Sequence, residues 1–533
     1  MTSHGVLWPC ALALLHVMYA QMQARPPHIV VIIADDLGWN DVSWNNKKMH
    51  TPNLEKLARE GVILDQHYVL PTCTPTRAAL LTGRYPFKLG IQGHGIRPLE
   101  PSGLPLGVTT LAEELKRRQY STHAFGKWHL GYCDWSLTPT RRGFETFRGF
   151  YAGAQDYFNH TVSGGKTSPQ ANGYDYRDCD NVDYSAKGIY STTLIANHVL
   201  ETIDDNFKRN GSMFLYVAFQ AVHAPLQAPS DYRAMCSSHA NKKRVKICEL
   251  LAVMDHAVGL IVKKLKEVKM WRNSLVVFMS DNGGQVLYGG NNWPLRGNKN
   301  TLYEGGTRVP AFVAGPLLKR SGYRSSSIVH LVDWFPTLLS VAGALENSAL
   351  EEIDGIDQWS AMRDGAETGP RAEFIYNLDC KKGKLVGAIR EGDLKLFLRP
   401  SSAFSGWYPE PEDNSARVET VGNASSSALY NITGLCHAQL KDGCKKGTLR
   451  ACGEDYIPYA KTSHLEYSGS LFEKQCKTFK EQIACSIQFC KNCLDGLSKA
   501  ATLLPLEALE DNIDVICING SKQYVGKEVY CNC

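Results

Sequence analysis

The chain has 533 residues, enough to bury one large hydrophobic core and one small one. Its hydrophobic content of 44% and charged content of 21% are ordinary for a globular protein, and the net charge of +5 fits an anionic substrate without requiring one. No Lys/Arg-rich run is present, so the sequence gives no support to nucleic-acid binding.

Residues 1–24 have the composition of a secretory signal peptide. Val6–Tyr19 is mostly apolar but too short to span a bilayer, although the absence of Lys and Arg before Arg25 is atypical. No later segment has the character of a transmembrane span. We therefore expect a protein of the secretory pathway, either secreted or held in the lysosomal lumen. Five N-glycosylation sequons agree with this route, at Asn159, Asn210, Asn423, Asn431 and Asn519.

Four apolar runs each lead into polar residues. His28–Ala34 is β-branched and continuous, as expected of a strand buried on both faces, and Tyr120–Phe125, Phe214–Phe219 and Leu275–Met279 are similar. Ligands of open α/β sheets bind beyond the carboxyl ends of parallel strands, so we expect the residues after these runs to share one site. Taken singly, each could be a helix cap or a turn. They are Asp35 and Asp36, Lys127 and His129, His223, and Asp281 and Asn282.

The segment Thr72–Arg77 contains the pattern Cys-x-Pro-x-Arg. An alanine- and leucine-rich helical pattern follows and ends at Gly83, and Pro75 suits its first turn. Cys73 is therefore expected at a helix N-terminus, where backbone N–H groups attract anions. Arg77 would lie one turn further along the same face. The alternative for Cys73 is an ordinary disulfide cysteine of a secreted protein.

These groups together predict a pocket for a small tetrahedral dianion or its ester. Asp35, Asp36, Asp281 and Asn282 offer oxygen ligands only, which suit Ca²⁺ or Mg²⁺ rather than zinc. A metal surrounded by several cations would stabilise developing negative charge. The cationic or potentially cationic residues are Arg77, Lys127, His129, His223 and Lys299.

The motif at Cys73 and several longer stretches resemble the sulfatase family, from about Pro26 to about Phe397. Within that family the likeness is greatest to arylsulfatase B, the N-acetylgalactosamine-4-sulfatase. The resemblance implies an α/β fold of the alkaline-phosphatase type: a mixed sheet flanked by helices, with a small antiparallel C-terminal subdomain. The stretches that carry it are residues 34–42, 126–131, 139–144, 222–227, 281–285 and 289–299.

The resemblance also implies a role for each site residue. Cys73 would be converted to formylglycine by the formylglycine-generating enzyme, and a hydroxyl of the hydrated aldehyde would attack sulfur. One Ca²⁺ would be bound by Asp35, Asp36, Asp281 and Asn282, with an oxygen on modified Cys73 completing the shell. Asp281 would be the base, and His223 would protonate the leaving alcohol with help from Lys299. Both Lys127 and Lys299 would neutralise charge on the sulfuryl group. His129 would help release sulfate, and Arg77 would hold the modified side chain.

The chain divides into three parts after the signal peptide. Residues 25–375 alternate strand-like and helix-like runs, including a helix over Leu250–Val268, and form the expected catalytic domain. Residues 376–435 form the small subdomain, with strands predicted at Leu385–Ile389 and Leu394–Leu398 and a loop or insertion over Ser401–Ser427. Residues 436–533 form a cysteine-rich tail that departs from the arylsulfatase B pattern and contains a helical stretch near Leu471–Ile487.

Ten of the seventeen cysteines lie in this tail, which indicates a disulfide framework in an oxidising compartment. A zinc or redox role for the Cys490-x-x-Cys493 pair has no supporting histidine or second pair. If Cys10 is removed with the signal and Cys73 is converted, fifteen cysteines remain. This odd number leaves one free thiol or one intermolecular disulfide.

Three functions remain open on the sequence. The first is an arylsulfatase-type hydrolase of sulfated sugars or aryl sulfates. The second is a phosphoryl-transfer hydrolase, which the oxygen ligands and Cys73 disfavour because such enzymes use two zinc ions with a Thr or Ser nucleophile. The third is a secreted structural or binding protein that retains the sulfatase fold and works through its tail. Trp293, near the Lys299 loop, is either a stacking platform for a ring or a core residue.

Overall fold

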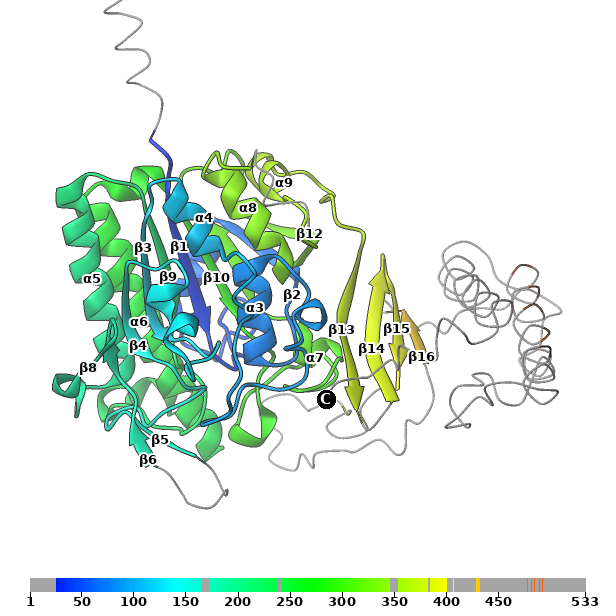
Figure 1. Ribbon diagram of the computed structural model, residues 1–533, viewed down its shortest axis with the longest axis horizontal. Helices are drawn as coiled ribbons and strands as arrows, with labels where there is room; N and C mark the ends of the chain where they lie inside the picture. The colour runs from blue at the N-terminus through cyan, green and yellow to red at the C-terminus, as the bar shows by residue number, and fades with distance from the viewer. Residues whose placement is uncertain are drawn as a thin grey trace, which may run out of the picture. The chain divides into compact units, whose positions relative to one another are not determined.

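The computed structural model of the chain describes residues 25–164, 172–237, 239, 241–345, 353–381, 384–399, 406 and 428–431, with single positions between 477 and 491. The chain splits into two compact units (Figure 1). The first comprises Met1–Ala372 and Ser401–Ala424, and the second comprises Glu373–Pro400 and Ser425–Cys533. In the described part, no helix has the length and apolarity needed to cross a membrane.

A ten-stranded mixed sheet forms the centre of the first unit, in the order β12-β2-β11-β10-β1-β9-β3-β4-β7-β8. Its five middle strands are parallel: β10 (Ser274–Ser280), β1 (His28–Ala34), β9 (Met213–Ala218), β3 (Ser121–Lys127) and β4 (Thr146–Phe150). One edge carries β11 (Ala311–Ala314), antiparallel to β10, then β2 (Val62–Tyr68) and β12 (Tyr323–His330). The other edge carries β7 (Arg177–Asp178) and β8 (Asn181–Val182).

The parallel strands end at one level. Ala34 at the end of β1 pairs with Ser280 at the end of β10, and Ala218 at the end of β9 pairs with Ile33 and Gly126. The residues that follow each strand therefore emerge along one edge of the sheet. This is the arrangement predicted from the four apolar runs, three of which match strands to within a residue.

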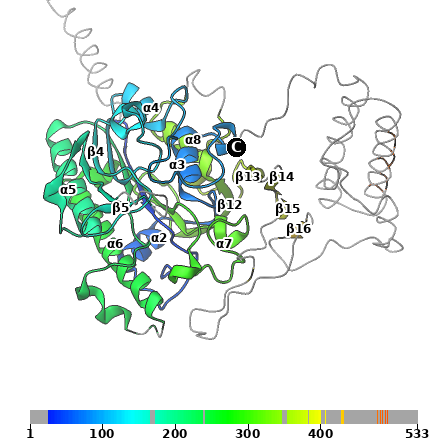
Figure 2. The ribbon, with the colours of Figure 1, turned by 60° about the horizontal axis from the view of Figure 1, so that its bottom comes forward.

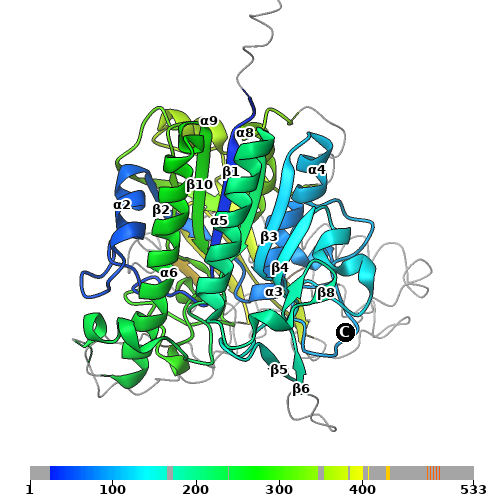
Figure 3. The same cartoon turned by 90° about the vertical axis from the view of Figure 1, so that its left-hand side faces the viewer.

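Helices cover both faces of the sheet. One layer contains α2 (Pro52–Glu60), α5 (Ser191–Arg209) and α6 (Lys242–Glu267), and Figure 3 shows α5 and α6 side by side across the strands. The other contains α3 (Cys73–Thr82), α4 (Leu111–Arg117) and α8 (Trp334–Val341), which are seen together in Figure 2. Both faces of β1 are buried, which explains its unbroken apolar sequence. Smaller elements are α7 (Glu304–Thr307), α9 (Trp359–Asp364) and the hairpin of β5 (Thr161–Ser163) with β6 (Asn172–Tyr174).

Helix α3 carries the Cys-x-Pro-x-Arg motif and is buried along its whole length. It ends where predicted, at Gly83, whose φ of 66° is left-handed and whose N–H donates to the Ala79 carbonyl. Because every residue of α3 is buried, the charge of Arg77 must be matched by a partner inside the protein.

Helix α6 begins eight residues before the predicted start at Leu250. The Asn241 side chain caps it by accepting hydrogen bonds from the Lys243 and Arg244 N–H groups. Its first turns are rich in Lys and Arg, so they carry no apolar periodicity. Arg244 is nevertheless buried, because its guanidinium pairs with Asp41 and donates to the Gly289 carbonyl.

The second unit contains a four-stranded antiparallel sheet of β13 (Glu373–Lys381), β14 (Lys384–Glu391), β15 (Leu394–Leu398) and β16 (Ala428–Asn431). The two strands predicted in this region lie in β14 and β15. The predicted signal peptide and tail disulfides, and nearly all of Ser401–Ser427 and Leu471–Ile487, lie outside the described residues. Among the described cysteines, Cys236 and Cys248 form a disulfide, while Cys73, Cys133 and Cys179 are not disulfide-bonded.

Candidate active site

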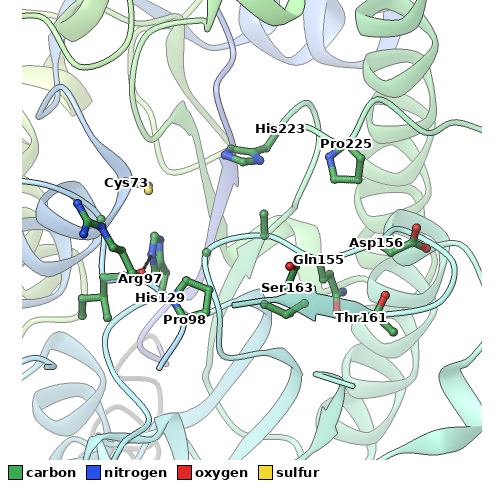
Figure 4. A pocket seen from close by; sticks show the side chains of 15 residues that line it. Cys73, Arg97, Pro98, His129, Gln155, Asp156, Thr161, Ser163, His223 and Pro225 are labelled. Carbon is green, nitrogen blue, oxygen red and sulfur yellow. Dashed lines mark hydrogen bonds between the residues drawn. The ribbon is translucent and has the colours of Figure 1, made fainter. Parts of the chain in front are cut away.

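Cys73 is the first residue of α3, and its side chain faces a cavity of about 500 Å³ (Figure 4). It is 5% exposed and forms no disulfide, and burial raises the pKa of its thiol. The alternative of an ordinary disulfide cysteine is therefore not what this structure shows. The cavity is lined by Cys73, Gly95, Ile96, Arg97, Pro98, His129, Gly153, Ala154, Gln155, Asp156, Thr161, Val162, Ser163, His223 and Pro225.

Three ion pairs lie beside Cys73, at the ends of the parallel strands. Each joins a buried carboxylate to a buried cation. The closest N–O distances are 2.6 Å from Lys127 Nζ to Asp35 Oδ2, 2.5 Å from Lys299 Nζ to Asp36 Oδ1, and 2.8 Å from Arg77 Nη2 to Asp281 Oδ2. The three positive and three negative charges balance, which is what makes so much buried charge tolerable.

The ion pairs favour the charged forms of Asp35, Asp36, Arg77 and Lys299. Burial alone would raise the pKa of Asp35 and Asp36, but the cations around them outweigh it and keep both values below the ordinary range. Burial alone would lower the pKa of Arg77 and Lys299, yet the neighbouring carboxylates raise both. The site therefore presents fixed charges of both signs.

Two buried oxygens of the predicted metal ligands have no hydrogen-bond partner among the described residues, Asp35 Oδ1 and Asn282 Oδ1. The amide nitrogen of Asn282 donates to Asp36 Oδ1 at 2.7 Å, which leaves the amide oxygen free to bind a cation. Unpartnered buried oxygens are costly unless a ligand uses them. A donor set of carboxylate and amide oxygens fits a hard divalent cation such as Ca²⁺.

A second arrangement involves one histidine. Ligand atoms of Asp35, Asp36 and His223 all lie within 4.8 Å of one another. Two carboxylates and an imidazole are a ligand set that suits a transition metal, whereas Ca²⁺ is bound through oxygen atoms alone. The oxygen set is the larger one, because Asp281 and Asn282 follow the neighbouring strand β10 and belong to it too.

The His129 ring is closely packed against Gly95 and Gly153, and a hydrogen bond fixes its tautomer. Its Nε2 is 2.8 Å from the Ile96 carbonyl, which can only accept, so Nε2 carries the proton and Nδ1 keeps its lone pair. Nδ1 is buried without a partner among the described residues. A Cβ added at Gly153 would lie 2.6 Å from His129 Cε1, and one at Gly95 would lie 2.9 Å from it and 3.3 Å from Cys73 Sγ. Burial, then the charge of Lys127, lowers the pKa of His129 well below its ordinary value.

His223 faces the same cavity from the segment after β9. Its Nδ1 is 2.6 Å from the Ala224 carbonyl and therefore carries a proton. Its Nε2 lies 3.7 Å from Asp36 Oδ2, and the side chain is 22% exposed. The nitrogen that can exchange a proton with a bound molecule is thus Nε2.

The structure brings all of the predicted site residues to one edge of the sheet, although their chemical roles stay predictions. The ion pairs among these residues were not foreseen, and neither was the hydrogen bond from Arg77 to the Lys127 carbonyl at 3.2 Å. Trp293 is not among the residues that line the cavity.

Sequence reasoning missed the walls of the cavity. These are the loop of residues 95–98, the turn at residues 153–156 and strand β5. Gln155 is 2% exposed, and its amide has no partner among the described residues. These residues lie in loops and a short strand, which have no hydrophobic periodicity. Gly95 and Gly153 are the residues whose type could have indicated a close approach of the backbone to His129, but this can be recognised only once the fold is known.

The chain was compared with known proteins. The family model described as Sulfatase matches residues 27–344. Mouse arylsulfatase J is 41% identical over 450 residues, which cover 78% of this chain and 74% of that protein. Human arylsulfatase A is 32% identical over 410 residues, covering 73% and 78%. The crystal structure of Ps i-CgsB with k-i-k-neocarrahexaose superposes with a TM-score of 0.66 at 26% identity, covering 92% of this chain and 100% of that one.

A phosphonate monoester hydrolase of Agrobacterium radiobacter has a TM-score of 0.50 at 19% identity, which is a likeness of fold alone. Together these matches confirm the predicted family and the predicted mixed α/β fold. The particular likeness to arylsulfatase B stays a prediction. The site geometry, the family model and the similarity to two arylsulfatases agree: the chain belongs to the sulfatase family and is a sulfuric ester hydrolase.

Proposed function

We propose that the chain hydrolyses sulfate esters with a formylglycine made from Cys73 and with one bound Ca²⁺. One observation carries the proposal. Cys73 lies at the start of a buried helix, facing a cavity, beside three cation–carboxylate pairs and two unpartnered ligand oxygens. A disulfide cysteine or a plain structural cysteine needs none of these neighbours.

The two added groups supply the reactivity that the twenty amino acids lack. The hydrated aldehyde of formylglycine supplies the hydroxyl that attacks sulfur, and Ca²⁺ supplies positive charge for the sulfate oxygens. Asp35, Asp36, Asp281 and Asn282 are the residues that would hold the cation.

The protein's own side chains bind the sulfate group and move protons. Lys127 and Lys299 are buried ammonium groups next to Cys73, suited to neutralise charge on the transferring sulfuryl oxygens. His223 Nε2 is the proton donor for the leaving oxygen, since its other nitrogen is held by a carbonyl. His129 Nδ1 is the proton acceptor that helps sulfate leave, since it has a lone pair and no partner among the described residues.

Both carboxylate oxygens of Asp281 already accept hydrogen bonds, which restricts its action as a base. Its Oδ2 accepts from Arg77 at 2.8 Å, and its Oδ1 accepts from the Asp36 N–H at 3.2 Å. We propose that it holds the metal and takes a proton only through Oδ1. Arg77 then positions the nucleophile indirectly, by fixing Asp281 and the carbonyl of Lys127.

The substrates that fit are sulfated sugars of the arylsulfatase B type and small aryl sulfates. The setting we propose is the secretory pathway, with the protein secreted or in the lysosomal lumen and the formylglycine-generating enzyme as a maturation partner. Asn159 and Asn210 are exposed and open to glycosylation there. The odd number of cysteines left after maturation supports one free thiol or one intermolecular disulfide.

The experiment is a comparison of nitrophenyl sulfate with nitrophenyl phosphate, together with metal analysis of the purified protein. We expect hydrolysis of the sulfate, little of the phosphate, and about one Ca²⁺ per chain. Two zinc ions per chain and a preference for phosphate would favour the phosphoryl-transfer alternative. No hydrolysis of either ester by protein carrying formylglycine would favour a structural or binding protein.

A further inference from the structure

The cavity extends well beyond the space that a sulfate group needs. Its volume of about 500 Å³ lies within the range of pockets that enclose small organic ligands. The reacting groups Cys73, His129 and His223 lie at one part of it (Figure 4). Across from His129, the exposed residues Thr161 and Ser163 of β5 form another wall. The space is therefore large enough for the part of a substrate that carries the sulfate.

Arg97 adds a positive charge to the lining of the cavity. It is exposed and lines the cavity on the same side as Cys73 and His129 (Figure 4). Its guanidinium forms no ion pair or hydrogen bond with any residue that the structure describes. The buried cations beside Cys73 differ from Arg97, because each of them pairs with a buried carboxylate. These cations are Arg77, Lys127 and Lys299.

The backbone of Arg97 is fixed to the catalytic centre. The Arg97 N–H donates to Glu100 Oε2 at 2.9 Å, and the preceding residue, Ile96, accepts from His129 and donates to Thr74 Oγ1 at 3.1 Å. Pro98 restricts the chain on the other side. The nearest carboxylate in sequence, Glu100, is thus used by the backbone, and the Arg97 side chain starts from a defined point.

We propose that Arg97 binds a second oxyanion of the substrate, a carboxylate or another sulfate, and that the enzyme prefers acidic sulfated saccharides over aryl sulfates with a single charge. The inference rests on the proposed function, because it places the sulfate ester at Cys73. A guanidinium offers paired N–H donors that match a carboxylate or sulfate edge, and it stays charged at any physiological pH.

The test compares three substrates in wild type and Arg97→Gln. They are a sulfated disaccharide with one uronate carboxylate, the same disaccharide with the carboxyl reduced to an alcohol, and nitrophenyl sulfate. We expect Arg97→Gln to lower kcat/KM on the uronate substrate about tenfold more than on the other two, mainly through KM. A disaccharide with two sulfates and no carboxylate shows whether the second anion is sulfate instead. Arg97→Lys, which keeps the charge, should retain part of the preference.

Arg272 provides the matched control. It is an exposed arginine in η7 (Met270–Asn273), which precedes β10, whereas the site follows the far end of that strand. Arg272→Gln should leave all the rates unchanged. If Arg97→Gln loses the same factor on the uronate disaccharide and on the disulfated disaccharide as on the two substrates with a single anionic group, while wild type still hydrolyses nitrophenyl sulfate, this inference alone is overturned. A wild type that hydrolyses no sulfate ester overturns the proposed function and this inference with it.

Discussion

Replacing His223 by alanine should damage turnover in proportion to how much the leaving group needs a proton. A sugar alcohol is a poor leaving group and needs one, whereas a nitrophenolate hardly does. General acid catalysis contributes about 10²–10⁴-fold, equivalent to about 3–5 kcal/mol of activation free energy. We therefore expect kcat/KM of His223→Ala to fall by about that factor on a sugar sulfate and by less than about tenfold on nitrophenyl sulfate.

The structure explains why the ratio of the two losses is informative. Nδ1 of His223 is held by the Ala224 carbonyl, so Nε2 is its one nitrogen available to the substrate. The contact of Nε2 with Asp36, at 3.7 Å, is present with either substrate, so its loss cancels in the ratio. Steady-state rates on both substrates, with thermal unfolding to verify the fold, measure the effect.

Lys127→Ala is the comparison variant. If Lys127 neutralises the sulfuryl group that all substrates share, as we propose, its loss should lower both rates alike, and the loss of the cation closest to Asp35 should also reduce stability. If His223→Ala lost the same factor on both substrates, then His223 would bind sulfate rather than donate the proton, and the assignment of the acid would be refuted.

Three further changes test a buried ion pair, the space beside Cys73 and the disulfide between Cys236 and Cys248. Asp281→Asn removes the carboxylate nearest the buried guanidinium of Arg77 and leaves Asp35 Oδ2 at 3.7 Å from Nη2, so the free energy of unfolding in urea with chelator present should fall by about 3 kcal/mol, and an unchanged value would contradict the pairing. Gly95→Ala places a methyl group 2.9 Å from His129 Cε1 and 3.3 Å from Cys73 Sγ, so His129 must shift and kcat should fall about 10²-fold; full activity would show that the space is not used. Cys236→Ser opens the loop of twelve residues closed by the disulfide with Cys248 and should cost about 3 kcal/mol in the same urea assay, a cost that reduction of the wild type should reproduce.

The sequence was most informative where burial constrains it on all sides. His28–Ala34 was predicted residue for residue, because a strand covered on both faces must be continuously apolar. The helix after Cys73 was predicted with its end, because Gly83 adopts the left-handed conformation that a helix C-terminus favours. Asp35 and Asp281 were predicted to lie side by side, because each follows a parallel strand and parallel strands end at the same edge of a sheet.

The sequence was least informative where long-range contacts decide the structure. The first turns of α6 are cationic and were missed, since the burial of Arg244 depends on Asp41, about two hundred residues away. The pairing of Arg77 with Asp281 joins a helix to a strand end and has no local signature. The wall that contains Arg97 is a loop, for which neither periodicity nor capping makes a prediction.

The central claim concerns the chemical identity of residue 73. Active enzyme, produced in a host with the formylglycine-generating enzyme, should be digested and the peptide containing residue 73 weighed by mass spectrometry. We expect an aldehyde in place of the thiol, a specific activity on nitrophenyl sulfate that rises in proportion to the aldehyde fraction, and almost no turnover in Cys73→Ser. Fully active enzyme that carries only a thiol or a disulfide at Cys73 would contradict this claim.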